Sequence, residues 1–185
     1  QNDNSGIVYC SSRARVDDIT SKLQAKGYKA EAYHAGYETE HRITVQEKFQ
    51  RDQVQIVVAT VAFGMGINKP NIRYVVHYDL PKTIESYYQE TGRAGRDGLP
   101  AECLMFFDTG DIPRVKRLIS DNPNEERAKV ELQRFNAMVA LADAQTCRRQ
   151  VLLHYFNEPS ATSCGNCDIC LDPPKSFDGL VLAQQ

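Results

Sequence analysis

Short apolar runs alternate with segments of helical periodicity up to about residue 110, and this alternation constrains the fold more than any other feature. The expected strands are 6–10, 30–34, 55–59, 73–77 and 103–107. Between them, Val16, Ile19 and Leu23 recur at helical spacing, and further helices are expected over 39–51 and from Thr83 onward. Strands that alternate with helices form mostly parallel sheets with helices on both faces. The sequence therefore predicts an α/β fold of that type.

Polar residues follow the predicted strands where each one ends. Ser11 and Ser12 come after the first run, His34 ends the second, and Thr60 follows the third. The carboxyl ends of parallel strands lie at one edge of a sheet, and ligands bind there in folds of this class. We therefore expect these residues to share a ligand-binding edge.

The pattern changes after Asp108. Residues 111–156 carry apolar residues at helical spacing, and the polar, proline-containing segment 121–124 predicts a break between helices. Pro173 and Pro174 mark a boundary. The expected divisions are a first domain at 1–110, a helical subdomain at 111–174, and the start of a following domain at 175–185.

The formal net charge of −2 argues against a chain that holds nucleic acid by bulk charge alone. Any such contact must come from the local placement of a few basic and polar groups. The sequence contains no apolar run of membrane length and no secretory signal pattern. We expect a soluble, intracellular protein that does not contact a membrane.

Four of the six cysteines cluster near the C-terminus, and in an intracellular protein this favours a metal site over disulfides. The four are Cys147, Cys164, Cys167 and Cys170. A C-x₂-C-x₂-C loop and one distant cysteine supply the four thiolates that fill a structural zinc site. An iron–sulfur cluster is the competing interpretation, although such sites typically continue with a further cysteine and a proline. Cys10 and Cys103 sit in apolar runs and are expected to be buried thiols.

The segment 89–98 reads QETGRAGRDG, and its two arginines can project together from a loop. Glycine lets this backbone approach a neighbouring surface closely. Guanidinium groups bind phosphate oxygens bidentately, and an arginine on a γ-phosphate is worth about 10³–10⁵ in rate. On these residues alone, a solvated surface turn is an equal alternative.

The motifs of this chain resemble the RecQ branch of the superfamily 2 helicases. QETGRAGR at 89–96 looks like motif VI, IVVAT at 56–60 with AFGMGINKP at 62–70 looks like motif V, and YHAG at 33–36 looks like the segment between motifs IV and V. With the cysteine pattern, the resemblance covers nearly the entire chain. It implies a second RecA-like motor lobe followed by a zinc-binding module. The phosphate loop and the acidic box that bind ATP and Mg²⁺ do not occur here, and the family carries them on its first lobe. The chain alone is therefore not expected to hydrolyse ATP.

The resemblance also implies roles for individual residues. Arg96 is the first choice for the γ-phosphate arginine, with Arg93 beside it. Gln89 would couple the ATP cleft to the DNA side, and Gly66 and Asn68 would line the cleft. A motor that steps must hold backbone rather than bases, so strand-end residues suit the contact with a DNA strand. The candidate DNA contacts are Ser11, His34, Thr60, Arg13 and Arg42, each of which could instead serve capping or surface solvation.

The implied protein is an ATP-dependent 3′-to-5′ DNA helicase of recombination, repair and the SOS response in the bacterial cytoplasm, associated with the nucleoid. Its implied partners are single-stranded and duplex DNA and a single-strand-binding protein. Two alternatives stay open: a zinc-stapled binding module without a motor cycle, and an RNA-directed relative. The sequence also leaves open whether Arg148 and Arg149 face DNA or offset the charge of the thiolates.

Overall fold

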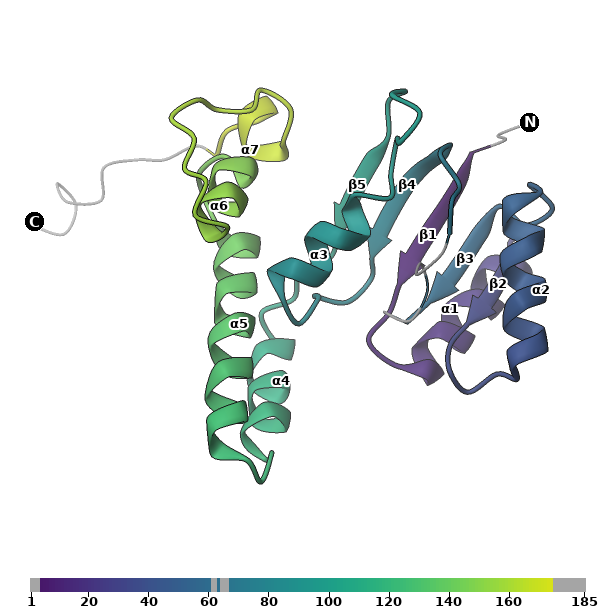
Figure 1. The fold of residues 1–185 in the computed structure, drawn as a ribbon, viewed down its shortest axis with the longest axis horizontal. Coiled ribbons are helices and arrows are strands. Elements are labelled where there is room, and N and C mark those ends of the chain that lie inside the picture. Colours follow the sequence, from purple (N-terminus) through teal and green to yellow (C-terminus); the bar gives the residue numbers. More distant parts are fainter. Residues whose placement is uncertain (1–3, 61–62, 64–66, 175–185) are drawn as a thin grey trace, which may run out of the picture.

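Strand β1 (Ser5–Tyr9) lies at the centre of a five-stranded, fully parallel sheet in the computed structural model, which describes residues 4–60, 63 and 67–174 (Figure 1). The order is β2-β3-β1-β4-β5, and the other strands are β2 (Ala30–Tyr33), β3 (Ile56–Ala59), β4 (Ile72–His77) and β5 (Glu102–Met105). Tyr9 is in register with both Ala59 and His77, and Tyr33 with Ala59. The predicted parallel sheet is confirmed, and the carboxyl ends of its strands share one edge.

Helices cover both faces of this sheet because side chains alternate along each strand. The two helices over β1–β3 are α1 (Arg13–Ala25) and α2 (Thr39–Gln50). Ile7 packs in one buried cluster with Phe49 of α2, whereas Val8 packs in another with Val16 of α1. The period-two alternation of a central strand therefore builds two separate apolar layers.

Side-chain caps fix where several helices begin. The Ser12 hydroxyl accepts a hydrogen bond from the Arg15 N–H at 3.3 Å, and the Thr83 hydroxyl accepts one from the Ser86 N–H at 3.1 Å. Such caps satisfy backbone donors that the first helical turn leaves unpaired. The chain leaves α1 through Gly27, whose φ of +86° is a left-handed conformation that favours glycine.

Cys10 is buried on the α1 side of the sheet, as predicted, but the prediction that Cys103 is buried is wrong. Cys103 lies on β5, which forms an edge of the sheet, and it is exposed together with Leu104 and Phe106. Only Met105 of this strand packs against a buried cluster. An apolar run can thus form an edge strand that is largely exposed, and the run itself does not distinguish this case from a buried strand.

Helices form most of the described chain after Asp108, with the expected break at 121–124. The helices that follow β4 are α3 (Ile84–Thr91), α4 (Asp111–Ser120), α5 (Glu125–Asp143), α6 (Arg148–Tyr155) and α7 (Asp168–Leu171). Ile84 of α3 packs with Met138 and Leu141 of α5, and the Tyr155 hydroxyl donates to Glu85 Oε1 at 2.9 Å. The helical region is thus docked onto α3. No helix in the described ranges is long and apolar enough to cross a membrane.

Candidate functional site

Ser11 begins the loop between β1 and α1 at the carboxyl edge of the sheet. Its backbone N–H donates to Oδ2 of Asp79 at 2.7 Å, and the same carboxylate forms an ion pair with the Arg15 guanidinium. The Asp79 charge is the main cause of a raised pKa at Arg15. Because Asp79 lies in the loop after β4, one carboxylate ties two strand-end loops together. Neither Asp79 nor Arg15 is among the site residues predicted from sequence, although Asp79 follows a predicted strand end.

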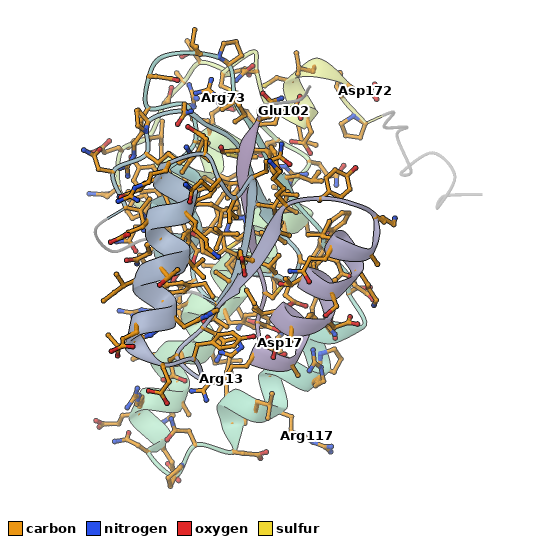
Figure 2. The ribbon with its side chains drawn as sticks, turned by 90° about the vertical axis from the view of Figure 1, so that its right-hand side faces the viewer. Arg13, Asp17, Arg73, Glu102, Arg117 and Asp172 are labelled. Atoms are coloured by element: carbon orange, nitrogen blue, oxygen red, sulfur yellow. The ribbon has the colours of Figure 1, made fainter. Side chains whose placement is uncertain are left out.

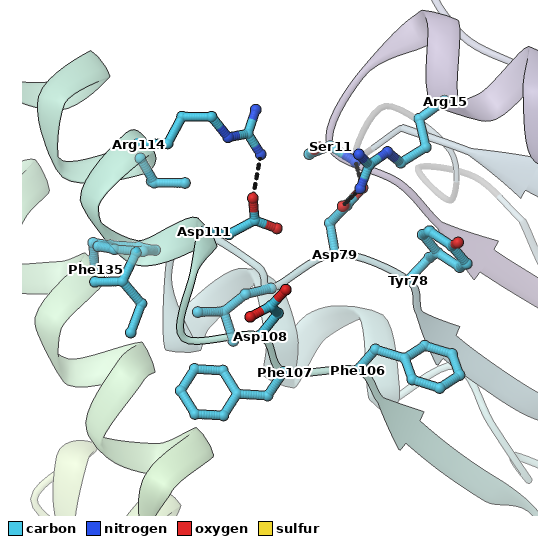
Figure 3. A pocket seen from close by; sticks show the side chains of 13 residues that line it. Ser11, Arg15, Tyr78, Asp79, Phe106, Phe107, Asp108, Asp111, Arg114 and Phe135 are labelled. Atoms are coloured by element: carbon cyan, nitrogen blue, oxygen red, sulfur yellow. Dashed lines mark hydrogen bonds and ion pairs between the residues drawn. The ribbon is translucent and has the colours of Figure 1, made fainter.

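A cavity of about 480 Å³ opens beside this ion pair (Figure 3). Aromatic side chains of Tyr78, Phe106 and Phe107 line it from the ends of β4 and β5. Across the cavity, Asp111 and Arg114 of α4 form an ion pair at 3.0 Å. The cavity therefore has apolar walls and charges of both signs. It lies at the carboxyl edge of the sheet, where parallel sheets bind their ligands.

His34 lies on the same edge, but its ring is engaged within the chain. Nε2 lies 3.1 Å from Asp17 Oδ1, Nδ1 accepts the Gly36 N–H at 3.1 Å, and the ring stacks on Tyr37. The side chain is buried. A contact with phosphate through either ring nitrogen would have to replace one of these bonds. The geometry favours a role for His34 in shaping the loop after β2.

The other predicted DNA contacts differ in exposure. Thr60 is half-buried at the end of β3, and its N–H donates to the Tyr33 carbonyl at 3.3 Å. Arg13 is exposed at the start of α1. Arg42 is half-buried on α2 and donates through Nη2 to Thr39 at 3.1 Å. The carboxyl edge of the sheet thus carries Ser11, Thr60 and Arg13. Arg42 lies one helical turn into α2.

The arginine segment runs along the sheet face that α2 covers, because Ala94 packs against the same apolar cluster. Gly95 has φ +62°, and its N–H donates to the Ile72 carbonyl at 2.9 Å. Arg73 and Asp97 form a half-buried ion pair at 2.5 Å. The segment is therefore anchored to the amino end of β4, and Figure 2 shows Arg73 and Arg13 at opposite ends of the sheet.

The two predicted catalytic arginines differ in environment. Arg93 is buried at 8% exposure, whereas Arg96 is exposed and donates through Nε to the Gly92 carbonyl at 3.0 Å. Gln89 and Asn68, predicted for the ATP cleft, are both exposed. Gly66 lies outside the described residues. Arg96 is thus accessible at the surface of this chain, whereas Arg93 is buried.

Arg93 adjoins a buried polar cluster of Tyr9, His77 and Glu90 that was not predicted from sequence. His77 Nε2 lies 2.7 Å from Glu90 Oε2, and both side chains are almost fully buried. The Tyr9 hydroxyl donates to the Phe63 carbonyl at 3.1 Å and is hydrogen-bonded to the Arg93 side chain. Burial, opposed by the Arg93 charge, raises the pKa of Tyr9, so its hydroxyl stays neutral.

Lys69 anchors the end of the predicted motif V segment. Its ammonium is only 2% exposed and lies 2.6 Å from Asp52 Oδ1 and over the Phe49 ring. The bond from Lys69 is the main cause of a lowered pKa at Asp52, which also accepts the Ser5 hydroxyl at 3.2 Å. The pair ties this segment to the turn between α2 and β3.

Replacing Asp52 by asparagine is expected to destabilise the protein by about 1–2 kcal/mol at pH 7, because the buried Lys69 loses its counter-charge. The effect is no larger because Asp52 is exposed and solvent screens its charge. Asparagine tolerates the left-handed φ of +58° at this position. Because the folded pKa of Asp52 is lowered, the contribution is complete above the unfolded pKa of about 4 and disappears as pH falls through the folded pKa. Urea unfolding at pH 7 and pH 3 measures both effects.

The matched control is Asp18→Asn, which removes an exposed pair with Lys22 and is expected to change stability little. Equal effects of the two substitutions at pH 7 would contradict the role assigned to Lys69.

The four clustered cysteines converge at the C-terminal end of the described chain. Their sulfurs all lie within 4.8 Å of one another, and those of Cys164 and Cys170 are 3.9 Å apart. A zinc–sulfur distance of about 2.3 Å in a tetrahedron places sulfurs about 3.8 Å apart, so the spacing fits a tetrathiolate zinc site. Burial raises the pKa of Cys147, but bonds from backbone N–H groups, first that of Cys164, outweigh it and lower the pKa to about 6. The donors favour the thiolate form that a metal requires.

Arg148 joins the cysteine loop to the long helix. Its guanidinium binds Asp168 at 2.8 Å and donates to the carbonyls of Leu141 and Ala142 at the end of α5. Its backbone N–H points at the Cys167 sulfur at 3.4 Å. These bonds engage the Arg148 side chain within the chain and connect α5 to α7, a role that was not predicted from sequence. Asp168 is the main cause of the raised pKa of Arg148, and the Cys167 charge also contributes, in line with the predicted balance of charge at the cysteines.

Comparisons with known proteins agree with this arrangement. A model of the helicase conserved C-terminal domain family matches residues 1–98, and a model of the RecQ zinc-binding family matches residues 109–171. An ATP-dependent DNA helicase RecQ of Pasteurella multocida is 55% identical over 185 residues, which cover 100% of this chain and 29% of that protein. A putative ATP-dependent RNA helicase R290 of Acanthamoeba polyphaga mimivirus is 42% identical over 171 residues, covering 92% of this chain and 31% of that protein.

The chain spans about three tenths of the length of the RecQ helicases of Pasteurella multocida and Haemophilus influenzae. Among solved structures, a Saccharomyces cerevisiae Dbp5 variant bound to a Gle1 variant and IP6 superimposes with a TM-score of 0.55. It is 19% identical, and the match covers 72% of this chain and 39% of that one. This likeness shows the fold alone.

Proposed function

Because the chain belongs to the RecQ family of helicases, with a helicase C-terminal domain and a RecQ zinc-binding module, we propose that it is the second motor lobe of an ATP-dependent DNA helicase. The observation that carries the proposal is the contrast between the two arginines of one anchored segment. Arg96 is exposed, while Arg93 is buried and hydrogen-bonded to Tyr9. A guanidinium exposed at the surface of one lobe can bind a phosphate held on another lobe.

In the proposed cycle, ATP and Mg²⁺ bind to a first lobe, and closure brings Arg96 onto the phosphates with Arg93 beside it. The arginines stabilise charge that develops on the transferred phosphoryl group. Gln89, Asn68 and Gly66 are the proposed cleft residues around them. This chain on its own is not expected to hydrolyse ATP, because its sequence contains neither a phosphate loop nor an acidic box for Mg²⁺.

The carboxyl edge of the sheet is the proposed path of a single DNA strand. Support comes from the shared position of Ser11, Thr60 and Arg13 at strand ends, on the opposite end of the sheet from Arg73. His34 is a weaker candidate because both of its ring nitrogens are engaged within the chain. Arg42 is weaker because it is half-buried and lies within α2 rather than at a strand end. Hydroxyl, amide and guanidinium donors bind phosphates without reading sequence.

We further propose that Cys147, Cys164, Cys167 and Cys170 bind one structural Zn²⁺. Four thiolates leave no open coordination position, so the ion would stabilise α5–α7 rather than take part in the reaction.

The proposed division of the chain is 1–110, 111–174 and 175–185. On family membership, the proposed setting is recombination, repair and the SOS response at the bacterial nucleoid, with a single-strand-binding protein as a partner.

The full-length protein with ATP is expected to unwind a DNA duplex with a 3′ single-stranded tail and to leave a 5′-tailed duplex intact. Gel-resolved strand separation of the two substrates measures this polarity. Equal or reversed unwinding would contradict it. One relative is named as a putative RNA helicase, so a 3′-tailed RNA duplex is tested as a third substrate. Faster unwinding of RNA than of DNA would favour an RNA-directed motor.

A further inference from the structure

Both chain neighbours of Arg96 are bonded to the short segment that leads into β4. The Gly95 N–H donates to the Ile72 carbonyl at 2.9 Å, and the Asp97 N–H donates to the Pro70 carbonyl at 3.3 Å. The rotamers that a side chain can adopt depend on its backbone dihedrals. A backbone that is held directly before and after Arg96 therefore restricts the directions in which this side chain can leave the surface.

The side chain of Arg73, the second residue of β4, clamps the same turn. Its Nη2 lies 2.5 Å from Oδ1 and 2.6 Å from Oδ2 of Asp97, and its Nη1 donates to the Pro100 carbonyl at 3.0 Å. The bond from Arg73 is also the main cause of a lowered pKa at Asp97, so the carboxylate is charged at physiological pH. One guanidinium thus holds the chain at two points that follow Arg96.

The guanidinium of Arg96 takes its direction from this turn. Its Nε donates to the Gly92 carbonyl at 3.0 Å, so the side chain folds back along its own segment before it reaches the surface. Within the turn, the Gly98 N–H donates to the Gly95 carbonyl at 3.0 Å. The direction of Arg96 therefore depends on the turn at residues 95–98, and the position of this turn depends on its bonds to residues 70–73.

We propose that Arg73 and Asp97 are positioning residues that fix this turn so that Arg96 points at the phosphate bound on the first lobe. The inference rests on the proposed function of Arg96. Neither residue touches the nucleotide, because the Arg73 guanidinium and the Asp97 carboxylate bind each other. A displacement of about 1 Å can lower a rate on the order of a hundredfold, so a reacting group on a turn needs such support.

Replacing Asp97 by asparagine in the full-length protein tests this, because the amide keeps the shape of the side chain but removes the charge that Arg73 binds. The kcat for DNA-stimulated ATP hydrolysis is expected to fall about ten- to a hundredfold. The KM for ATP and the Kd for single-stranded DNA should each stay within about twofold, since only an interaction of the transition state is weakened. Arg73→Gln should lose as much, and Arg73→Lys, which keeps the charge, should recover part of the rate.

The same substitution in the Arg96→Ala background decides between positioning and a merely structural pair. If the clamp acts through Arg96, Asp97→Asn should cause no further loss in single-turnover hydrolysis, because residues that act as a unit are not additive. Equal fold losses in both backgrounds would overturn the inference. The control is Glu131→Gln, which breaks an exposed ion pair with Arg127 on α5 and should keep the wild-type kcat.

Each kcat is referred to the folded fraction, which melting followed by circular dichroism gives for every variant. Wild-type kcat in both Asp97→Asn and Arg73→Gln, with Arg96→Ala inactive, would overturn this inference alone. Full activity of Arg96→Ala would instead overturn the proposed function.

Discussion

Replacing Arg96 by alanine in the full-length protein is expected to lower kcat for ATP hydrolysis by about 10³–10⁵-fold, the contribution of an arginine that reaches the transferred phosphoryl group. Single-stranded DNA affinity should change by less than about twofold, because Arg96 lies away from the strand-end edge. Its guanidinium is exposed, and its one described hydrogen bond is to the Gly92 carbonyl, so truncation leaves no buried group unpaired. Steady-state ATPase assays at saturating DNA, with DNA binding measured by fluorescence anisotropy, give both quantities.

Two further variants sharpen this result. Arg96→Lys keeps the charge but loses the bidentate fork, so it should recover only a small part of the rate. Arg117→Ala removes an exposed arginine of α4 and should leave ATPase unchanged. Retained ATPase with weakened DNA binding in Arg96→Ala would favour a binding module over a motor.

The second large effect concerns the cysteine cluster: Cys167→Ala is expected to abolish zinc binding and unfold α5–α7. Structural zinc contributes about 10–16 kcal/mol in small zinc-dependent folds, and that free energy is coupled to folding. ATPase should fall as well, because Met138 and Leu141 of α5 support Ile84 at the start of α3. Bound metal is measured by elemental analysis, and the folded state by limited proteolysis.

Cys103→Ser is the matched control, since Cys103 is exposed and lies outside the cluster. It should keep one zinc per chain and the protease resistance of the wild type. Unchanged proteolysis of Cys167→Ala would contradict a structural metal. A brown protein with visible absorption and bound iron would instead favour the iron–sulfur interpretation.

Features encoded by local sequence patterns could be predicted. The strand alternation around Ile7 and Val8 predicted two covered faces, and both are present. The C-x₂-C-x₂-C spacing brings three sulfurs together within one short loop, so only the approach of Cys147 depended on the tertiary fold. The shared edge of Ser11 and Thr60 followed from parallel pairing, which the alternation of elements already implied.

Features that depend on distant partners could not be predicted. Asp79 is 68 residues from Ser11, and nothing in either local sequence identifies the other as its partner. His34 looked like a free strand-end donor because its bond to Asp17 forms only when α1 packs beside β2. The His77–Glu90 pair was not predicted for the same reason, because it joins β4 to α3 and forms only when the helix packs on the strand.

The most direct measurement is a structure of the full-length protein bound to single-stranded DNA, Mg²⁺ and ADP with aluminium fluoride, a mimic of the transferred phosphoryl group. The expected result places a guanidinium nitrogen of Arg96 about 2.7–3.0 Å from a fluoride of the mimic, with the nucleotide held by the first lobe. A closed complex in which Arg96 points into solvent or contacts DNA instead would contradict the claim that this lobe supplies the catalytic arginine.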